Sequence, residues 1–153
     1  MVEYQDSFVP VDNLNVKTLD TVYSFTRKIF EGLGLFPINL YYLKAGDMQR
    51  VGNAVVIYVK NEDLSYVGFG REIFADYDVV ADVWLQYGAR NEIDKVVAGV
   101  HKYVEGYEPK RDLINNASVV WLKIGREMNM QTKLRGKAVY RFEFEIRTYE
   151  QVV

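Results

Sequence analysis

Residues 74–87, FADYDVVADVWLQY, alternate between two kinds of side chain with a period of two. One parity is entirely apolar from position 77 onward, whereas the other parity includes Asp76, Asp78 and Asp82. Successive residues of a β-strand point to opposite faces of a sheet, so this stretch predicts a long strand with one buried face. A sheet of this kind needs a second layer that covers its apolar face.

Five further stretches predict strands of the same sheet. Within the stretch 138–149, residues 140–147 alternate strictly. Aromatic and aliphatic side chains occupy one parity, and the other parity carries charges of both signs (Arg141, Glu143, Glu145 and Arg147), so that cross-strand neighbours can pair. Residues 53–60 are nearly continuous in β-branched and aromatic residues, which is typical of a central strand that is covered on both faces. The remaining predicted elements of the sheet are short strands at residues 38–43, 65–69 and 119–124 and a turn at residues 61–63.

Helices are predicted in two places that flank the middle strands. The first helix is expected to begin at Thr18, whose hydroxyl can accept a backbone N–H, and to end at Gly32. The second is expected to run from Asn91 to Gly106, and both carry an apolar stripe at three- and four-residue spacing. A short third helix is predicted at residues 109–115.

The order of these elements predicts an α+β fold. A mostly antiparallel β-sheet packed against two main helices gives a two-layer sandwich. The length of 153 residues fits one domain. The predicted organisation is an N-terminal arm at residues 1–17, which has no clear period, followed by a single α+β domain at residues 18–153.

The composition excludes several classes of functional site. The chain has no cysteine, which excludes disulfides, thiolate metal sites and cysteine nucleophiles. It has one histidine, His101, and a lone histidine beside an apolar stripe is typical of a boundary packing residue rather than a catalytic base. No apolar run approaches the ~20 residues that cross a bilayer, and the first residues lack the charged and apolar blocks of a signal peptide. We therefore expect no membrane association, no cofactor and no bound metal.

Two patterns could carry chemistry, and each has a simpler interpretation. Asp76, Asp78 and Asp82 could hold a divalent cation or supply an acid–base pair, or they could form the solvated face of an amphipathic strand. The G-x-G at residues 68–70 lacks the third glycine and the following helix of a dinucleotide-binding loop, which favours a hairpin or a bulge. No catalytic group of residues emerges, so the sequence predicts a protein that is not an enzyme.

Aromatic residues are abundant, with 2 Trp, 12 Tyr and 8 Phe. Tyrosine suits surfaces that are partly apolar and partly wet, which include sheet faces and protein interfaces. Trp84 and Trp121 could stack a ligand, but a place in the core or in an interface is the more usual role of tryptophan.

The charge is unevenly spread along the chain, although its net value is only −2. Residues 61–120 hold eleven acidic and six basic side chains, and residues 121–153 hold four acidic and seven basic ones. Two interpretations stay open: ordinary surface variation, or an acidic face and a basic face that meet in a head-to-tail oligomer.

A long polar segment at residues 125–137 separates the last two predicted strands. A loop of this length without structure of its own is usually functional or lacks a fixed structure. Its methionines can make adaptable apolar contacts and its basic residues supply charge, so we expect it to contact a partner. The candidate interface residues are Arg126, Met128, Met130, Lys133, Arg135 and Lys137.

The order of elements over residues 18–150 resembles the tail terminator, or tail completion, proteins of long-tailed bacteriophages. The resemblance begins with the leading amphipathic helix. It continues with the run AVVIYV at 54–59, the long strand YDVVADVWL at 77–85, a helix opened by NEID at 91–94 and the closing strand VYRFEFEI at 139–146.

The resemblance implies a structural virion protein, assembled in the host cytoplasm, that forms a homohexameric ring in the neck. Such a ring caps the completed tail tube, stops its polymerisation and provides the head–tail joining surface. Its implied partners are the tail tube protein and a head-completion or connector protein, and DNA passes through its lumen without specific binding. Two alternatives stay open: another phage neck, connector or baseplate protein, and, in a different class, a small-molecule-binding or divalent-ion-binding α+β module.

Overall fold

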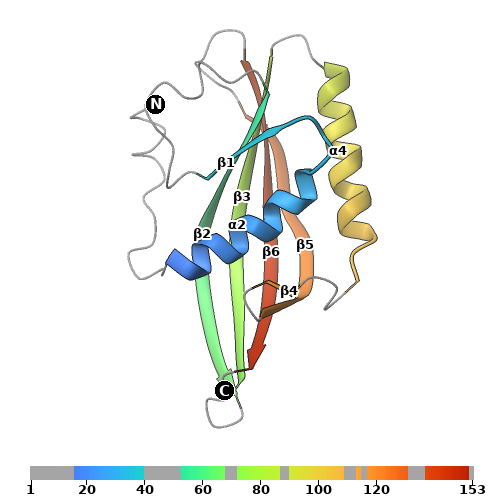
Figure 1. Cartoon of the computed structure of the whole chain (residues 1–153). Helices are drawn as coiled ribbons and strands as arrows, with labels where there is room; N and C mark the ends of the chain where they lie inside the picture. The colour runs from blue at the N-terminus through green and yellow to red at the C-terminus, as the bar shows by residue number, and fades with distance from the viewer. Residues whose placement is uncertain are drawn as a thin grey trace.

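The structure is a computed structural model that describes residues 16–39, 53–67, 72–86, 90–108, 113–114, 117–130 and 137–151. The elements in chain order are α2 (Val16–Phe30), β1 (Phe36–Asn39), β2 (Ala54–Val67), β3 (Glu72–Gln86), α4 (Arg90–Glu105), β4 (Leu113–Ile114), β5 (Ala117–Met130) and β6 (Lys137–Gln151). Figure 1 shows α2 crossing one face of the sheet while α4 runs beside β5.

The strands form one sheet in the order β1-β2-β3-β6-β5-β4. β1 pairs with β2 in parallel, and every other pair of neighbours is antiparallel. β3 and β6 lie at the centre and pair with each other along their whole lengths. This arrangement confirms the predicted α+β sandwich with a mostly antiparallel sheet and two main helices.

The core lies between the helices and one face of the sheet. Val22, Phe25 and Ile29 recur at three- and four-residue steps along α2 and are at most 2% exposed. Phe30, at the end of the helix, packs edge-on against Phe142 of β6, with ring centroids 6.0 Å apart. Burying one such aromatic side chain contributes about 1.5–3 kcal/mol, so these contacts fix α2 on the sheet.

The opposite face of the sheet is also buried at the end of β2 that pairs with β1. Residues 54–59 of β2 are all at most 5% exposed, which confirms that this stretch is covered on both faces, although β2 lies between β1 and β3 rather than at the centre of the sheet. On β3 the same face buries Val80, Asp82 and Trp84. Asp82 is the one carboxylate among them, and it accepts two hydrogen bonds from Arg141 at 2.7 and 2.9 Å.

The predicted turn at residues 61–63 is wrong, because β2 continues through it to Val67. The ladder with β3 absorbs the irregularity through a register shift between Val59 and Asn61 and then resumes. Figure 1 shows that β2 and β3 extend past α2. Polar residues are tolerated here because Asn61 and Asp63 are exposed and Glu62 is half-buried. The strand predicted separately at 65–69 is therefore the end of β2, as far as it is described.

The predicted loop at residues 125–137 is also wrong over much of its length. Residues 125–130 belong to β5, which pairs with β6 up to Met130 opposite Val139, and Lys137 is the first residue of β6. Register shifts within β5 break the simple alternation that marks a strand in sequence, while tertiary pairing with β6 sustains it.

Smaller corrections concern the ends of elements. α2 begins at Val16, two residues before Thr18, and ends at Phe30. Gly32, the predicted end of the helix, follows in the left-handed region with φ of 81°. The strand predicted at 38–43 is β1 at Phe36–Asn39, and its last four residues lie outside the described part. Within the helix predicted at 109–115, Leu113–Ile114 instead forms β4, and the other residues lie outside the described part. Residues 1–15 of the predicted arm are likewise outside it.

Candidate functional site

The sheet face that is turned away from the helices changes character along its strands. Its buried part, around Asp82, gives way to an open part that carries Asp78, Glu145 and Arg147. The cross-strand register places Asp78 opposite Glu145 and Asp76 opposite Arg147. This open part is the candidate functional site, because a charged sheet face that no described element covers is available to a partner.

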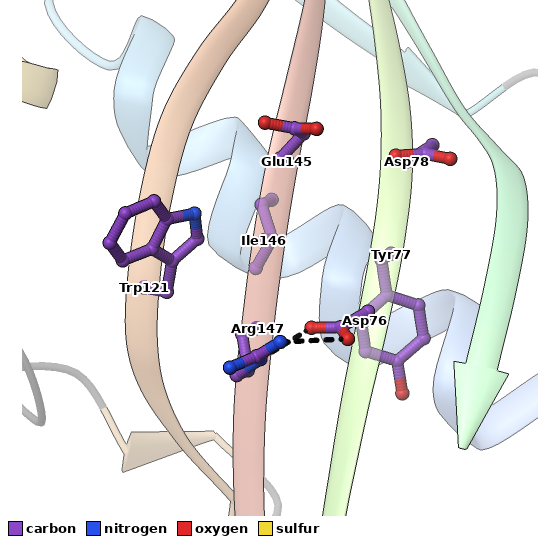
Figure 2. Close-up of a pocket in the computed structure, with 7 residues that line it drawn as sticks. All are labelled: Asp76, Tyr77, Asp78, Trp121, Glu145, Ile146 and Arg147. Carbon is purple, nitrogen blue, oxygen red and sulfur yellow. Dashed lines mark hydrogen bonds and ion pairs between the residues drawn. The ribbon is translucent and has the colours of Figure 1, made fainter. Parts of the chain in front are cut away.

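A hollow of about 360 Å³ lies on this open part, between β3, β6 and β5 (Figure 2). The residues that line it are Asp76, Tyr77, Asp78, Trp121, Glu145, Ile146 and Arg147. Tyr77 and Ile146 belong to the core on the other face, so the charged side chains and Trp121 form the walls.

Trp121 is the most exposed large apolar side chain of the described residues, at 54% exposure. It follows a register shift in β5, between Val119 and Trp121, which places it opposite Arg147 on β6. Val119 before the shift is buried in the core. The shift therefore turns an aromatic ring from the core side of β5 to the open face.

Arg147 of β6 and Asp76 of β3 form a bidentate ion pair. The guanidinium donates from Nε at 2.6 Å and from Nη2 at 3.1 Å, as the dashed lines in Figure 2 show. The hydrogen bond and the charge of Asp76 raise the pKa of Arg147 above its ordinary value. Both side chains are about half exposed, so this pair orders the wall of the hollow but contributes little to stability.

Asp78 and Glu145 form a cross-strand pair of like charges, which is unfavourable when the two side chains are directly opposite. Glu145 lies 4.0 Å from the ammonium of Lys123, which is a weak contact between exposed groups. Asp78 has no ion pair with any described residue. The middle of the hollow is therefore short of positive charge.

A second hollow of about 240 Å³ adjoins the first and shares Asp78 and Glu145 with it. Arg126 and Glu143 also line it, and Glu143 lies 3.7 Å from the ammonium of Lys60. The two hollows form one continuous site along the open face.

Of the three predicted interface residues whose side chains the structure describes, one lies at this site. Arg126 lines the second hollow, whereas Met128 and Met130 lie further along β5, opposite Arg141 and Val139. The remaining three, Lys133, Arg135 and the side chain of Lys137, lie outside the described part, so their contact with a partner stays a prediction.

The three aspartates of β3 share one sheet face as predicted, but they do not form a metal site. Asp82 is hydrogen-bonded to Arg141 and Asp76 to Arg147, whereas Asp78 has no ion pair with another described residue. Within the described ranges, no three acidic or histidine side chains gather closely enough to hold a metal ion.

His101 joins a cluster that the sequence did not reveal. Its Nε2 lies 2.7 Å from Oε2 of Glu127, and the Tyr140 hydroxyl donates to Oε1 of Glu127 at 2.6 Å. Burial raises the pKa of Glu127, but the hydrogen bonds from Tyr140 and His101 outweigh it and lower the pKa below its ordinary value. Burial and the bond to Glu127 raise the pKa of Tyr140 to about 12. The cluster fastens α4 to β5 and β6, on the opposite side of the sheet from the hollows.

Comparison with known proteins finds no matching family model and no matching curated protein. A solved structure does match. It is a chain of the "Virion of native gene transfer agent (GTA) particle", which superposes with a TM-score of 0.55 at 15% sequence identity. The match covers 88% of this chain and 94% of that chain. At this identity the likeness concerns the fold. None of the described helices is both long and apolar enough to cross a membrane.

Proposed function

We propose that this protein is a structural component of a phage-like virion particle. The observation that carries the proposal is the agreement in fold with a chain of a gene transfer agent virion over 88% of this chain and 94% of that one. Because the match covers nearly all of both chains, it relates whole folds rather than one shared motif. The open site supports the same proposal, since exposed Trp121 and Arg147 are of the residue types enriched at protein interfaces.

Within this class we propose the role of a tail terminator, on the basis of the resemblance of the sequence over residues 18–150. In this role the chain forms a homohexameric ring that caps the tail tube, stops its polymerisation and joins it to a head-completion or connector protein. The protein is then a neck component of the virion, assembled in the host cytoplasm, and DNA passes through the ring. A ring needs head-to-tail contacts between two different surfaces of each copy.

The ring is tested on the purified chain by multi-angle light scattering and negative-stain microscopy. Six copies of a 17.8 kDa chain give about 107 kDa. Ring-shaped particles of this mass support the terminator. A monomer at every accessible concentration contradicts it, and stabilisation of that monomer by Mg²⁺ or Ca²⁺ would instead favour the divalent-ion-binding module.

The terminator role is separated from other neck or baseplate roles by tail length. Tails assembled without the protein are expected to be longer and more variable than tails assembled with it, and purified protein added to growing tubes is expected to stop their growth. Particles that contain the protein but whose tail length does not depend on it would retain the virion assignment and overturn the terminator.

A further inference from the structure

The walls of the first hollow suit a cationic side chain. The indole of Trp121 stands on one side and the carboxylate of Asp78 on the other, with Glu145 between them on β6 (Figure 2). A cation is attracted by the face of an indole and by both carboxylates. It would also relieve the repulsion between Asp78 and Glu145, which the described residues leave uncompensated at Asp78.

The basic segment of this chain at residues 131–137, QTKLRGK, has the complementary charge. It contains Lys133, Arg135 and Lys137 and no acidic residue, whereas the lining of the hollow has three carboxylates and one guanidinium. The three basic residues alternate along the segment, so in an extended chain they would lie on one side. Asp76 and Asp78 on β3, and Glu143 and Glu145 on β6, have the same spacing of two residues.

The segment cannot reach the hollow of its own copy. Glu145 lies eight residues after Lys137 along β6, which is about 26 Å at ~3.3 Å per residue. A connection of six residues fixed at Met130 and Lys137 extends about 12 Å at most, because it must go out and return. A second copy of the chain has no such limit.

We propose that the hollow formed by Trp121, Asp78 and Glu145 receives the basic segment 131–137 of a second copy of this chain. The contact joins two different surfaces, so each copy both gives a segment and receives one, and repetition of the contact closes a ring or extends a filament. The inference rests on the proposed function, since it names the contact by which the ring would form.

Paired charge reversals test the contact. In one variant Asp78→Lys and Glu145→Lys reverse the charge of the hollow. In the other variant Lys133→Glu and Arg135→Glu reverse the charge of the segment. Each variant alone is expected to associate at least tenfold more weakly than the wild-type chain in sedimentation velocity. An equimolar mixture is expected to recover assembly. The reversed segment of one variant is complementary to the reversed surface of the other, and the unchanged segment and unchanged surface also remain complementary. Lys102→Glu, an exposed change on α4, is the control and should assemble like the wild-type chain.

A second measurement keeps the test decisive if a double reversal fails to fold. Trp121 is 54% exposed and Trp84 is 5% exposed, so quenching of fluorescence by acrylamide reports mainly on Trp121. Assembly of the wild-type chain is expected to protect Trp121 from quenching, and the milder variants Asp78→Asn and Lys133→Gln should reduce both assembly and protection.

The outcomes separate this contact from the proposed function. A wild-type ring that the reversals leave equally stable, with Trp121 still open to acrylamide, overturns the contact and leaves the ring standing. A wild-type chain that never self-associates overturns both the ring and the contact.

Discussion

Asp82 and Arg141 lie directly opposite each other on β3 and β6 and are joined by two hydrogen bonds of 2.7 and 2.9 Å, with Asp82 fully buried. Six residues along the same two strands, Asp76 and Arg147 make the same two-pronged pair with both side chains about half exposed. The sheet thus contains the same ion pair twice, once in the interior and once at the surface.

Breaking the buried pair is expected to destabilise the protein strongly. Asp82→Ala removes the buried carboxylate that accepts both hydrogen bonds from the guanidinium of Arg141, and breaking such a pair costs about 3–5 kcal/mol. The double variant Asp82→Ala with Arg141→Met removes both charges and should lose much less. Urea unfolding of the two variants measures the difference, and a double variant as unstable as the single one would contradict this account.

The exposed pair is the matched control for the buried one. Asp76→Ala uses the same residue types on the same two strands, but solvent screens the charge that it leaves on Arg147. Its effect on the free energy of unfolding should therefore be a small fraction of that of Asp82→Ala. Equal effects would mean that the strand pairing, and not burial of the charges, determines the loss.

The faces of the long strands could be predicted from the sequence, and part of the site with them. Alternation over 74–87 placed Asp76, Asp78 and Asp82 on one face, because the parity of a strand is a local property. It could not place Asp78 opposite Glu145, because that register depends on pairing between strands 67 residues apart. The hollow is a product of register and therefore appears only in the folded sheet.

The wrong prediction of a loop at residues 125–130 has a related cause. Around Trp121 and residues 125–130, β5 shifts its register twice, and each shift exchanges the two faces of the strand. Alternation across such a shift looks like an irregular polar segment in sequence. The first shift carries Trp121 to the open face, and the second shift precedes residues 125–130, which the sequence predicted as a loop.

The cluster of His101, Glu127 and Tyr140 is expected to make the free energy of unfolding fall in acid. The folded-state pKa of Glu127 is lowered below its ordinary value, so its contribution is fully present above about pH 4.5 and is lost as the pH falls through the folded pKa. Because the cluster is partly open to solvent, the contribution is modest, about 1 kcal/mol or less. The measurement is urea unfolding from pH 7 to pH 3, in which Glu127→Gln should flatten this part of the acid loss. A variant with the same acid dependence as the wild-type chain would exclude the cluster as its source.

Ionisation of Tyr140 is expected to lower the stability of the fold at alkaline pH. Its pKa is raised to about 12 from an ordinary value of 10.0, so the neutral phenol stabilises the fold below pH 10 and that contribution is lost as the pH rises toward 12. NMR titration of the ring carbon that bears the hydroxyl measures the pKa of this tyrosine separately from the others. In Glu127→Gln the pKa should fall toward the ordinary value, and an unchanged pKa would leave burial as its whole cause.

Gly99 on α4 is expected to tolerate alanine but not valine. A β-carbon added at Gly99 would lie 2.8 Å from Cδ2 of Leu33, the far end of a flexible side chain that can rotate away. Gly99→Ala also removes the helix penalty of glycine, about 1 kcal/mol, so the two effects should nearly cancel. Gly99→Val adds branched bulk against Leu33 and should cost about 1–3 kcal/mol. The control is Ala98→Val, at an exposed position of the same helix, which should lose only helix propensity.

Hydrogen exchange should rank the strands by how many neighbours they have. β3 and β6 are paired on both sides along most of their lengths, so most of their amides are hydrogen-bonded and should exchange slowly. Among the described residues, β1 pairs with β2 only at Ala54–Ile57 and β4 pairs with β5 only at Ala117 and Ser118. Beyond these points β2 and β5 have one neighbour among the described strands, so alternate amides should exchange fast in the isolated chain. Slow exchange at every amide of Asn61–Val67 or of Trp121–Met130 in a monomer would contradict the sheet order described here.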